Sequence, residues 1–89
     1  MSPVIRKHIV FYGRVQGVGF RYRARHAAAL AGTTGWVRNE SDGSVSMEIQ
    51  GREEQIDKVI ELISQGTFVL IEDMDSRIIP VRDDERDFY

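Results

Sequence analysis

Two segments with helical periodicity lie between segments typical of β-strands, and this order constrains the fold more than any other feature. Apolar residues from Phe20 to Ala31 recur at helical spacing, the alanines among them favour a helix, and Gly32 follows as a stop signal. Between about Glu53 and Ser64, apolar residues recur at positions i, i+3, i+4 and i+7. The sequence therefore predicts two amphipathic helices.

Strand signals precede the first helix and fill the interval between the two. Residues 8–14 begin with β-branched and aromatic side chains that predict a central strand. Residues 35–39 and 44–50 predict a hairpin with its turn at residues 41–43, and its second strand alternates apolar and polar residues. Gly51 is expected to end that strand.

After the second helix the strand signals are weaker. Residues 68–71 and 77–81 resemble strands, but the acidic run 72–75 is expected to interrupt them. The tail that follows is too charged for a core, although Phe88 and Tyr89 could begin a short final strand.

The predicted order is β-α-β-β-α-β, with a short fifth strand as an option at the C-terminus. This order is typical of the ferredoxin-like split βαβ sandwich, an α+β fold in which two helices cover one face of an antiparallel sheet. A chain of 89 residues suits one domain, spanning residues 1–89. Because this fold hosts many unrelated functions, function has to be argued from the site.

Composition excludes several classes of function. The chain has no cysteine, which removes disulfides, thiolate metal sites and cysteine nucleophiles. No apolar run is long enough to cross a membrane and no signal-peptide core is present, so we expect a cytoplasmic protein. Residues 1–45 carry seven Lys or Arg and two Asp or Glu, whereas residues 46–89 carry five and twelve. The basic half attracts small anions.

The loop between the first strand and the first helix, residues 15–21, has the features of an anion cradle. Gly17 and Gly19 allow a sharp turn and a close approach to a ligand, or serve only a tight connection. The N–H groups of a loop that leads into a helix N-terminus suit a phosphate group. Arg21 opposes the helix dipole but can donate two parallel hydrogen bonds to phosphate oxygens. We therefore expect an anion to bind there.

This loop differs from other phosphate-binding loops. It lacks the lysine of a Walker A loop and the third glycine of a dinucleotide-binding loop. Phosphatases with a covalent intermediate have cysteine where Val15 stands, so a reaction at phosphorus here needs water as the nucleophile. We expect His8 and His26 to be structural or surface residues in preference to its base. An acyl phosphate would relax this requirement, because its carboxylate leaving group needs little acid catalysis to depart.

Two blocks of sequence resemble the signatures of the acylphosphatase family, namely residues 13–21 and residues 35–39 followed by Asp42-Gly43. The resemblance implies hydrolysis of acyl phosphates to a carboxylate and inorganic phosphate, without a metal or cofactor. It also implies that Arg21 binds the phosphate, that Asn39 holds the attacking water, and that a substrate phosphate oxygen accepts the water's proton. The loop residues that it implies for binding the phosphate are Gln16, Gly17, Val18, Gly19 and Phe20.

Two other functions compete with hydrolysis. A non-catalytic module that binds phosphate or carbamoyl phosphate would need the same cradle, although an asparagine that orients water favours catalysis. RNA binding is disfavoured, because the faint RNA-binding motif in residues 17–20 lies at a helix start and the acidic half would repel a long polyanion.

We therefore expect a monomer whose partners are a small acyl phosphate and inorganic phosphate, the latter as product or inhibitor, with no nucleic acid and no membrane. Arg14 and Arg38 either add positive potential at the site or are only exposed. Arg23 and Arg25 make the first helix more basic than hydrolysis requires.

Overall fold

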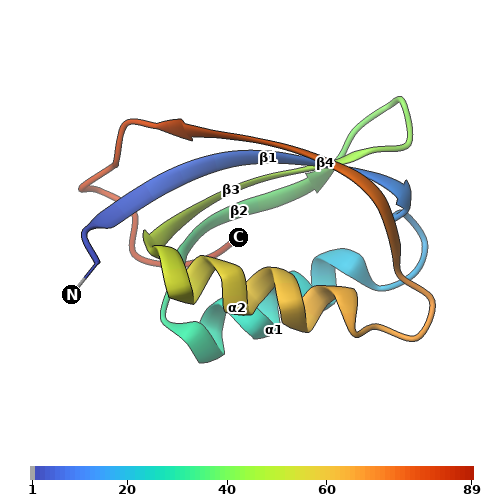
Figure 1. Cartoon of the computed structure of the whole chain (residues 1–89), viewed down its shortest axis with the longest axis horizontal. Coiled ribbons are helices and arrows are strands. Elements are labelled where there is room, and N and C mark those ends of the chain that lie inside the picture. The colour runs from blue at the N-terminus through green and yellow to red at the C-terminus, as the bar shows by residue number, and fades with distance from the viewer. Residues whose placement is uncertain (1) are drawn as a thin grey trace.

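The structure, a computed structural model, describes residues 2–89. Its elements are β1 (Val4–Arg14), α1 (Phe20–Ala31), β2 (Thr34–Asn39), β3 (Val45–Arg52), α2 (Glu53–Ser64) and β4 (Leu70–Ile79). The four strands form one antiparallel sheet in the order β2-β3-β1-β4, and both helices pack on the same face of it (Figure 1). The predicted ferredoxin-like split βαβ fold is confirmed.

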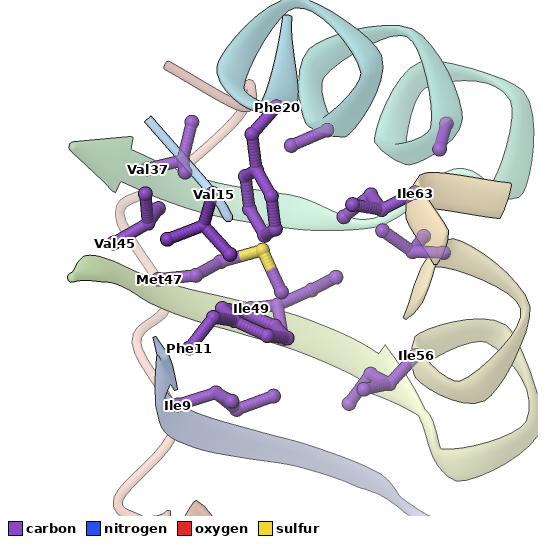
Figure 2. Close-up of a cluster of buried hydrophobic side chains, with 13 residues drawn as sticks. Ile9, Phe11, Val15, Phe20, Val37, Val45, Met47, Ile49, Ile56 and Ile63 are labelled. Carbon is purple, nitrogen blue, oxygen red and sulfur yellow. The ribbon is translucent and has the colours of Figure 1, made fainter. Parts of the chain in front are cut away.

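A hydrophobic core fills the space between the sheet and the helices. Alternate residues of β1 and β3 face the helices, among them Ile9, Phe11 and Met47, which are fully buried (Figure 2). The ring centroid of Phe20, the first residue of α1, lies 4.9 Å from that of Phe11. Burial of one such side chain stabilises the fold by about 1.5–3 kcal/mol. The start of α1, next to the predicted anion loop, is therefore anchored to the central strand.

Specific hydrogen bonds set the ends of both helices. α1 ends at Gly32, whose φ of 77° lies in the left-handed region that favours glycine. At the start of α2, the side-chain oxygen of Gln55 accepts a hydrogen bond from the N–H of Arg52 at 2.8 Å. The side-chain nitrogen of Gln55 donates to the carbonyl of Ala31 at 2.8 Å, which joins α2 to the end of α1. Neither helix, nor any other among residues 2–89, is long and apolar enough to cross a membrane.

Two strands, β1 and β3, extend further than the sequence prediction. β1 begins at Val4 instead of His8. β3 does not end before Gly51, because Gly51 pairs with Ile5 of β1. A Cβ atom on Gly51 would lie 2.9 Å from Cγ2 of Thr33. Glycine is therefore needed here for a close approach of the neighbouring segment and does not break the strand.

The predicted interruption of β4 at residues 72–75 is wrong. β4 is continuous, and within the acidic run Asp73 pairs with Tyr12 of β1. β4 is an edge strand whose side chains are mostly exposed, so carboxylates there keep their hydration. Pairing with the central strand β1 outweighs the weak local strand signal.

The C-terminal segment returns from β4 and ends beside β2, where the chain terminus is marked in Figure 1. The N–H of Gly35 donates to the carbonyl of Asp87 at 3.1 Å, and the N–H of Tyr89 donates to the carbonyl of Gly35 at 2.9 Å. In place of a short final strand, the structure has an isolated parallel bridge between Gly35 and Phe88. This bridge covers the outer edge of β2.

The same segment covers Arg6, which is fully buried. The guanidinium donates to the carboxylate of Glu85 at 2.8 and 3.2 Å and to Glu48 at 3.1 Å. Glu85, a residue of the charged tail, is therefore nearly buried. The composition of the tail did not predict a buried side chain there. Burial alone would raise the pKa of Glu48, but hydrogen bonds with His8 and Arg6 outweigh burial and lower that pKa below its ordinary value of 4.5.

Candidate active site

The loop of residues 15–19 joins β1 to α1. Gly17 and Gly19 have positive φ values of 72° and 81°, and Gly19 is the N-cap residue of α1. Within the described part of the chain no side chain caps α1, and its first turn has no acidic residue. A Cβ atom on either glycine would meet no atom within 4 Å, so both glycines serve the backbone conformation. The N–H groups at this helix end are left free to bind an anion.

An open pocket of about 220 Å³ lies against this loop and contains both predicted catalytic residues. Arg21 extends from the first turn of α1, and Asn39 is the last residue of β2. Gly17, Gly19 and Phe20 also line the pocket. The structure therefore brings the two sequence blocks, which are far apart along the chain, to one place.

Strand alternation directs Asn39 toward the loop. Val37, two residues earlier in β2, is buried against the helices, and side chains two residues apart point to the same face of a sheet. Both Asn39 and Arg21 are exposed. Neither side chain takes part in the side-chain hydrogen bonds or ion pairs formed among residues 2–89, so both are free to contact a ligand.

Gln16 and Val18 have other roles than lining the pocket. The side-chain nitrogen of Gln16 donates to the carbonyls of Glu40 at 2.7 Å and Ser44 at 2.9 Å. These two carbonyls belong to the β2–β3 turn, directly after Asn39. Val18 packs against the hydrophobic core. The side chain of Gln16 therefore fixes the distance between the loop and the strand that carries Asn39.

Two residues without a predicted site role, Tyr22 and Arg25, also line the pocket. Arg25 lies one helical turn after Arg21, and this i, i+4 spacing is the signal that could have placed it there. Arg23 serves the helix pair instead, because its guanidinium donates to the carbonyl of Leu62 in α2 at 3.0 Å.

The side chain of Arg38 contacts Trp36 and Glu40 and does not line the pocket. Its guanidinium lies over the ring of Trp36, 4.9 Å from the centroid, and its Nε donates to Glu40 at 2.8 Å. Hydrogen bonds from Arg38 and Ser46 lower the pKa of Glu40, so this carboxylate stays ionised and offsets the charge of Arg38. Arg14 is exposed and does not line the pocket. Of the flanking arginines, Arg25 is therefore the one that adds charge to the site.

Neither histidine lines the pocket. His8 contacts Glu48 at 3.0 Å on the sheet, and the ring of His26 lies 4.3 Å from that of Tyr22 on α1. In residues 2–89 no group of three or more His, Asp or Glu is arranged to hold a metal ion.

The pocket thus combines guanidinium groups, the free N–H groups of a helix start, the phenol of Tyr22 and one amide side chain, while no imidazole or carboxylate of the described residues lines it. Guanidinium and N–H donors bind a phosphoryl group. An amide oxygen can accept a hydrogen bond from water and orient it, but the amide cannot take up a proton. This arrangement suits a phosphate ester or anhydride that reacts with water without a protein base.

Comparison with known proteins gives the same answer as the geometry. The model of the acylphosphatase family matches residues 7–89. The chain is 44% identical over 84 residues to the acylphosphatase of Geobacillus kaustophilus, covering 93% of this chain and 89% of that relative. It is 40% identical over 86 residues to the acylphosphatase of Clostridium beijerinckii, covering 96% of each.

Solved structures agree. The acylphosphatase from Bacillus subtilis has a TM-score of 0.85 at 30% identity over 94% of each chain. A full-length HypF in a phosphate- and nucleotide-bound form has a TM-score of 0.85 at 28% identity, covering 99% of this chain but 12% of HypF. With a family model that matches nearly the whole sequence and relatives at least 40% identical over most of their length, this chain belongs to the acylphosphatase family.

Proposed function

We propose that Arg21 and the loop N–H groups hold the phosphoryl group of an acyl phosphate, while Asn39 positions the water that attacks it. As a member of its family the chain hydrolyses acyl phosphates to a carboxylate and inorganic phosphate. The observation that carries the residue assignment is the pocket that Arg21 and Asn39 line together with Gly17 and Gly19.

In this mechanism the fork of Arg21 donates to two phosphate oxygens, and the N–H groups from about Gln16 to Arg21 donate to the others. The water oxygen forms a bond to phosphorus as the bond from phosphorus to the acyl oxygen breaks, and the carboxylate leaves with the electron pair. The proton of the water passes to a phosphate oxygen, so the reaction needs no protein base. Preorganised donors stabilise the charge that develops on the phosphoryl oxygens.

The second candidate is a module that binds phosphate or carbamoyl phosphate without turnover. The likeness to a HypF structure in a phosphate-bound form favours it, since that larger protein contains a domain of this shape. Asn39 favours catalysis, because binding of an anion alone does not need an amide beside the cradle. We further infer a monomer that acts in the cytoplasm and is inhibited by its product, inorganic phosphate.

The assay is hydrolysis of benzoyl phosphate by the wild type and by Arg21→Ala and Asn39→Ala, each with and without a chelator. Arg21→Ala should lower kcat/KM by about 10² to 10³, the usual effect of removing one preorganised donor, and should weaken inhibition by phosphate. Asn39→Ala should lower kcat and leave inhibition by phosphate nearly unchanged, because Asn39 contacts water and not the anion. The wild type should keep its turnover in the presence of the chelator.

The matched control is Arg77→Ala, which removes an exposed arginine beside His8 and Val10, remote from Arg21. It should change neither kcat/KM nor the inhibition by phosphate. Equal loss of phosphate inhibition in Arg21→Ala and Asn39→Ala would contradict the two roles. A wild type that binds phosphate but does not hydrolyse the substrate would support the binding module.

A further inference from the structure

A second pocket, of about 480 Å³, adjoins the candidate active site and shares one residue with it. Arg25 lines both pockets. The second pocket lies between the C-terminal half of α1 and the C-terminal segment, from which Arg86 and Phe88 line it. The two pockets therefore meet at the side chain of Arg25, and the second is the larger of the two.

The two pockets follow one face of α1. Arg21, Arg25 and Ala29 recur at i, i+4 and i+8, and the helix stop Gly32 continues this row. Each helical turn advances about 5.4 Å along the axis, so the second pocket begins about one turn from the phosphate site. A short acyl chain attached to a phosphate held at Arg21 spans that distance.

The charge of the second pocket is positive. Arg25 and Arg86 both line it and are both exposed, and neither takes part in the ion pairs formed among residues 2–89. Asp87 also lines it and is the carboxylate that opposes them, while its carbonyl is bound to the N–H of Gly35. Two guanidinium groups against one carboxylate leave a site that favours an anion.

We propose that this second pocket holds the acyl part of the substrate and that Arg25 and Arg86 favour acyl groups with a second anionic group at their far end. The proposal rests on the hydrolysis proposed above, because it assumes that the phosphoryl group lies at Arg21. The C-terminal segment, which the tail hydrogen bonds hold against β2, then supplies substrate selectivity in addition to covering the edge of the sheet.

Two substrates of similar length test the proposal: succinyl phosphate, which carries a terminal carboxylate, and butyryl phosphate, which ends in a methyl group. At low ionic strength the wild type should have the higher kcat/KM for succinyl phosphate, by about fivefold for each guanidinium that the carboxylate contacts, the size of an exposed charge pair. The preference should shrink at high salt, because screening weakens exposed charges.

Three variants locate the effect. Arg86→Gln should reduce the ratio of the two kcat/KM values by about fivefold, and Asp87→Asn should raise it, since it removes the opposing carboxylate. Arg77→Gln, the matched loss of an exposed arginine outside both pockets, should leave the ratio as in the wild type. Because the two tail variants are expected to change the ratio in opposite directions, loss of folding cannot mimic the result.

A wild-type ratio near one, or a ratio that neither Arg86→Gln nor Asp87→Asn changes, would overturn the proposal while leaving hydrolysis intact. Failure of the wild type to hydrolyse either substrate is a different result, which would overturn the proposed mechanism itself. A preference for butyryl phosphate would show that the apolar wall at Phe88 dominates the pocket, and this outcome also overturns the proposal.

Discussion

Gln16 has the clearest structural role of any single polar residue near the site. Its side-chain nitrogen donates to two carbonyls of the β2–β3 turn, and that turn is itself held by the carboxylate of Asp42, which accepts bonds from the N–H and hydroxyl of Ser44. The anion loop and the strand end that carries Asn39 are therefore fixed to each other. Water attack depends on this spacing, because a misplacement of 1 Å is enough to slow a reaction markedly.

Replacement Gln16→Leu should disturb activity without touching the substrate. The carbonyls of Glu40 and Ser44 each lose one donor and keep a backbone one, the N–H of Gly43 and of Glu40 respectively. Loss of two hydrogen bonds should lower the free energy of unfolding by about 1–3 kcal/mol. The loop then shifts relative to Asn39, and kcat should fall by about tenfold to a hundredfold. Urea unfolding and turnover of benzoyl phosphate measure the two effects.

Gln65→Leu is the matched control, because Gln65 is exposed at the end of α2 and its backbone, not its side chain, closes that helix. This control should change neither the stability nor kcat appreciably. A Gln16→Leu enzyme with unaltered kcat would show that Gln16 does not set the spacing between the loop and Asn39.

Among the elements, β4 has a sequence that protects the edge of the sheet against pairing with another molecule. It pairs with β1 along one side, and its other side is an edge of the sheet. Unpaired strand edges invite pairing with another molecule, and charged side chains oppose it. The acidic run of residues 72–75 lies in this edge strand, whereas the opposite edge, β2, is covered by the tail.

The triple replacement of Glu72, Asp73 and Asp75 by threonine should therefore make the protein self-associate. Threonine favours strands, so β4 should persist while its edge loses the repulsive charge. Light scattering at increasing protein concentration should show aggregates that the wild type does not form. The control replaces Glu53, Asp57 and Glu61 of α2 by glutamine, which removes the same number of charges away from the sheet edge. This variant should stay monodisperse, and equal aggregation of both variants would contradict a role for the charges on β4.

Local signals were sufficient for most of the elements. The apolar stripe and Gly32 set the limits of α1, and the glycine loop with Arg21 identified the cradle, because each of these features depends on neighbouring residues. The two sequence blocks that carry Arg21 and Asn39 could be assigned to one site because both resemble signatures of the acylphosphatase family.

The sequence prediction failed where the structure depends on contacts between residues that are far apart in the chain. Arg6 and Glu85 lie at opposite ends of the chain, and nothing near either residue indicates that they form a buried pair. The continuity of β4 depends on the partner strand β1 and not on its own composition. Helical periodicity places Arg25 on the face of Arg21, but it does not say which segment lies opposite, so the second pocket was not predicted.

At the scale of the whole molecule, the tail is part of the same packed unit as the sheet. The carboxylate of Glu85, in the tail, binds the buried Arg6. At the edge of β2, the N–H of Gly35 donates to the carbonyl of Asp87, and the N–H of Tyr89 donates to the carbonyl of Gly35. Removing one partner from a buried ion pair leaves an uncompensated charge, so the tail cannot detach without a large cost.

We therefore expect one cooperative unfolding transition. Fluorescence of Trp36, the sole tryptophan, reports on β2 beside the tail, while far-ultraviolet circular dichroism reports on all helices and strands. In urea the two signals should change together, at a midpoint that does not depend on protein concentration if the protein is a monomer. A change in Trp36 fluorescence at lower urea than the loss of dichroism would show that the tail and β2 separate first.

The position of β1 in the sheet also governs the synthesis of the protein. β1 is the first of the four strands of this sheet to be made, yet its two neighbours in the sheet are β3 and β4, and β4 is the last of the four. At about 5–20 residues per second, the chain between the end of β1 and the end of β4 takes roughly 3 to 13 s to translate. Throughout that interval the apolar face of β1 lacks its final neighbour, and Glu85, one of the two carboxylates that neutralise Arg6, has not yet been added. The native sheet is therefore completed only after β4 has been made, and until then the nascent chain is exposed to pairing with its neighbours on a polysome.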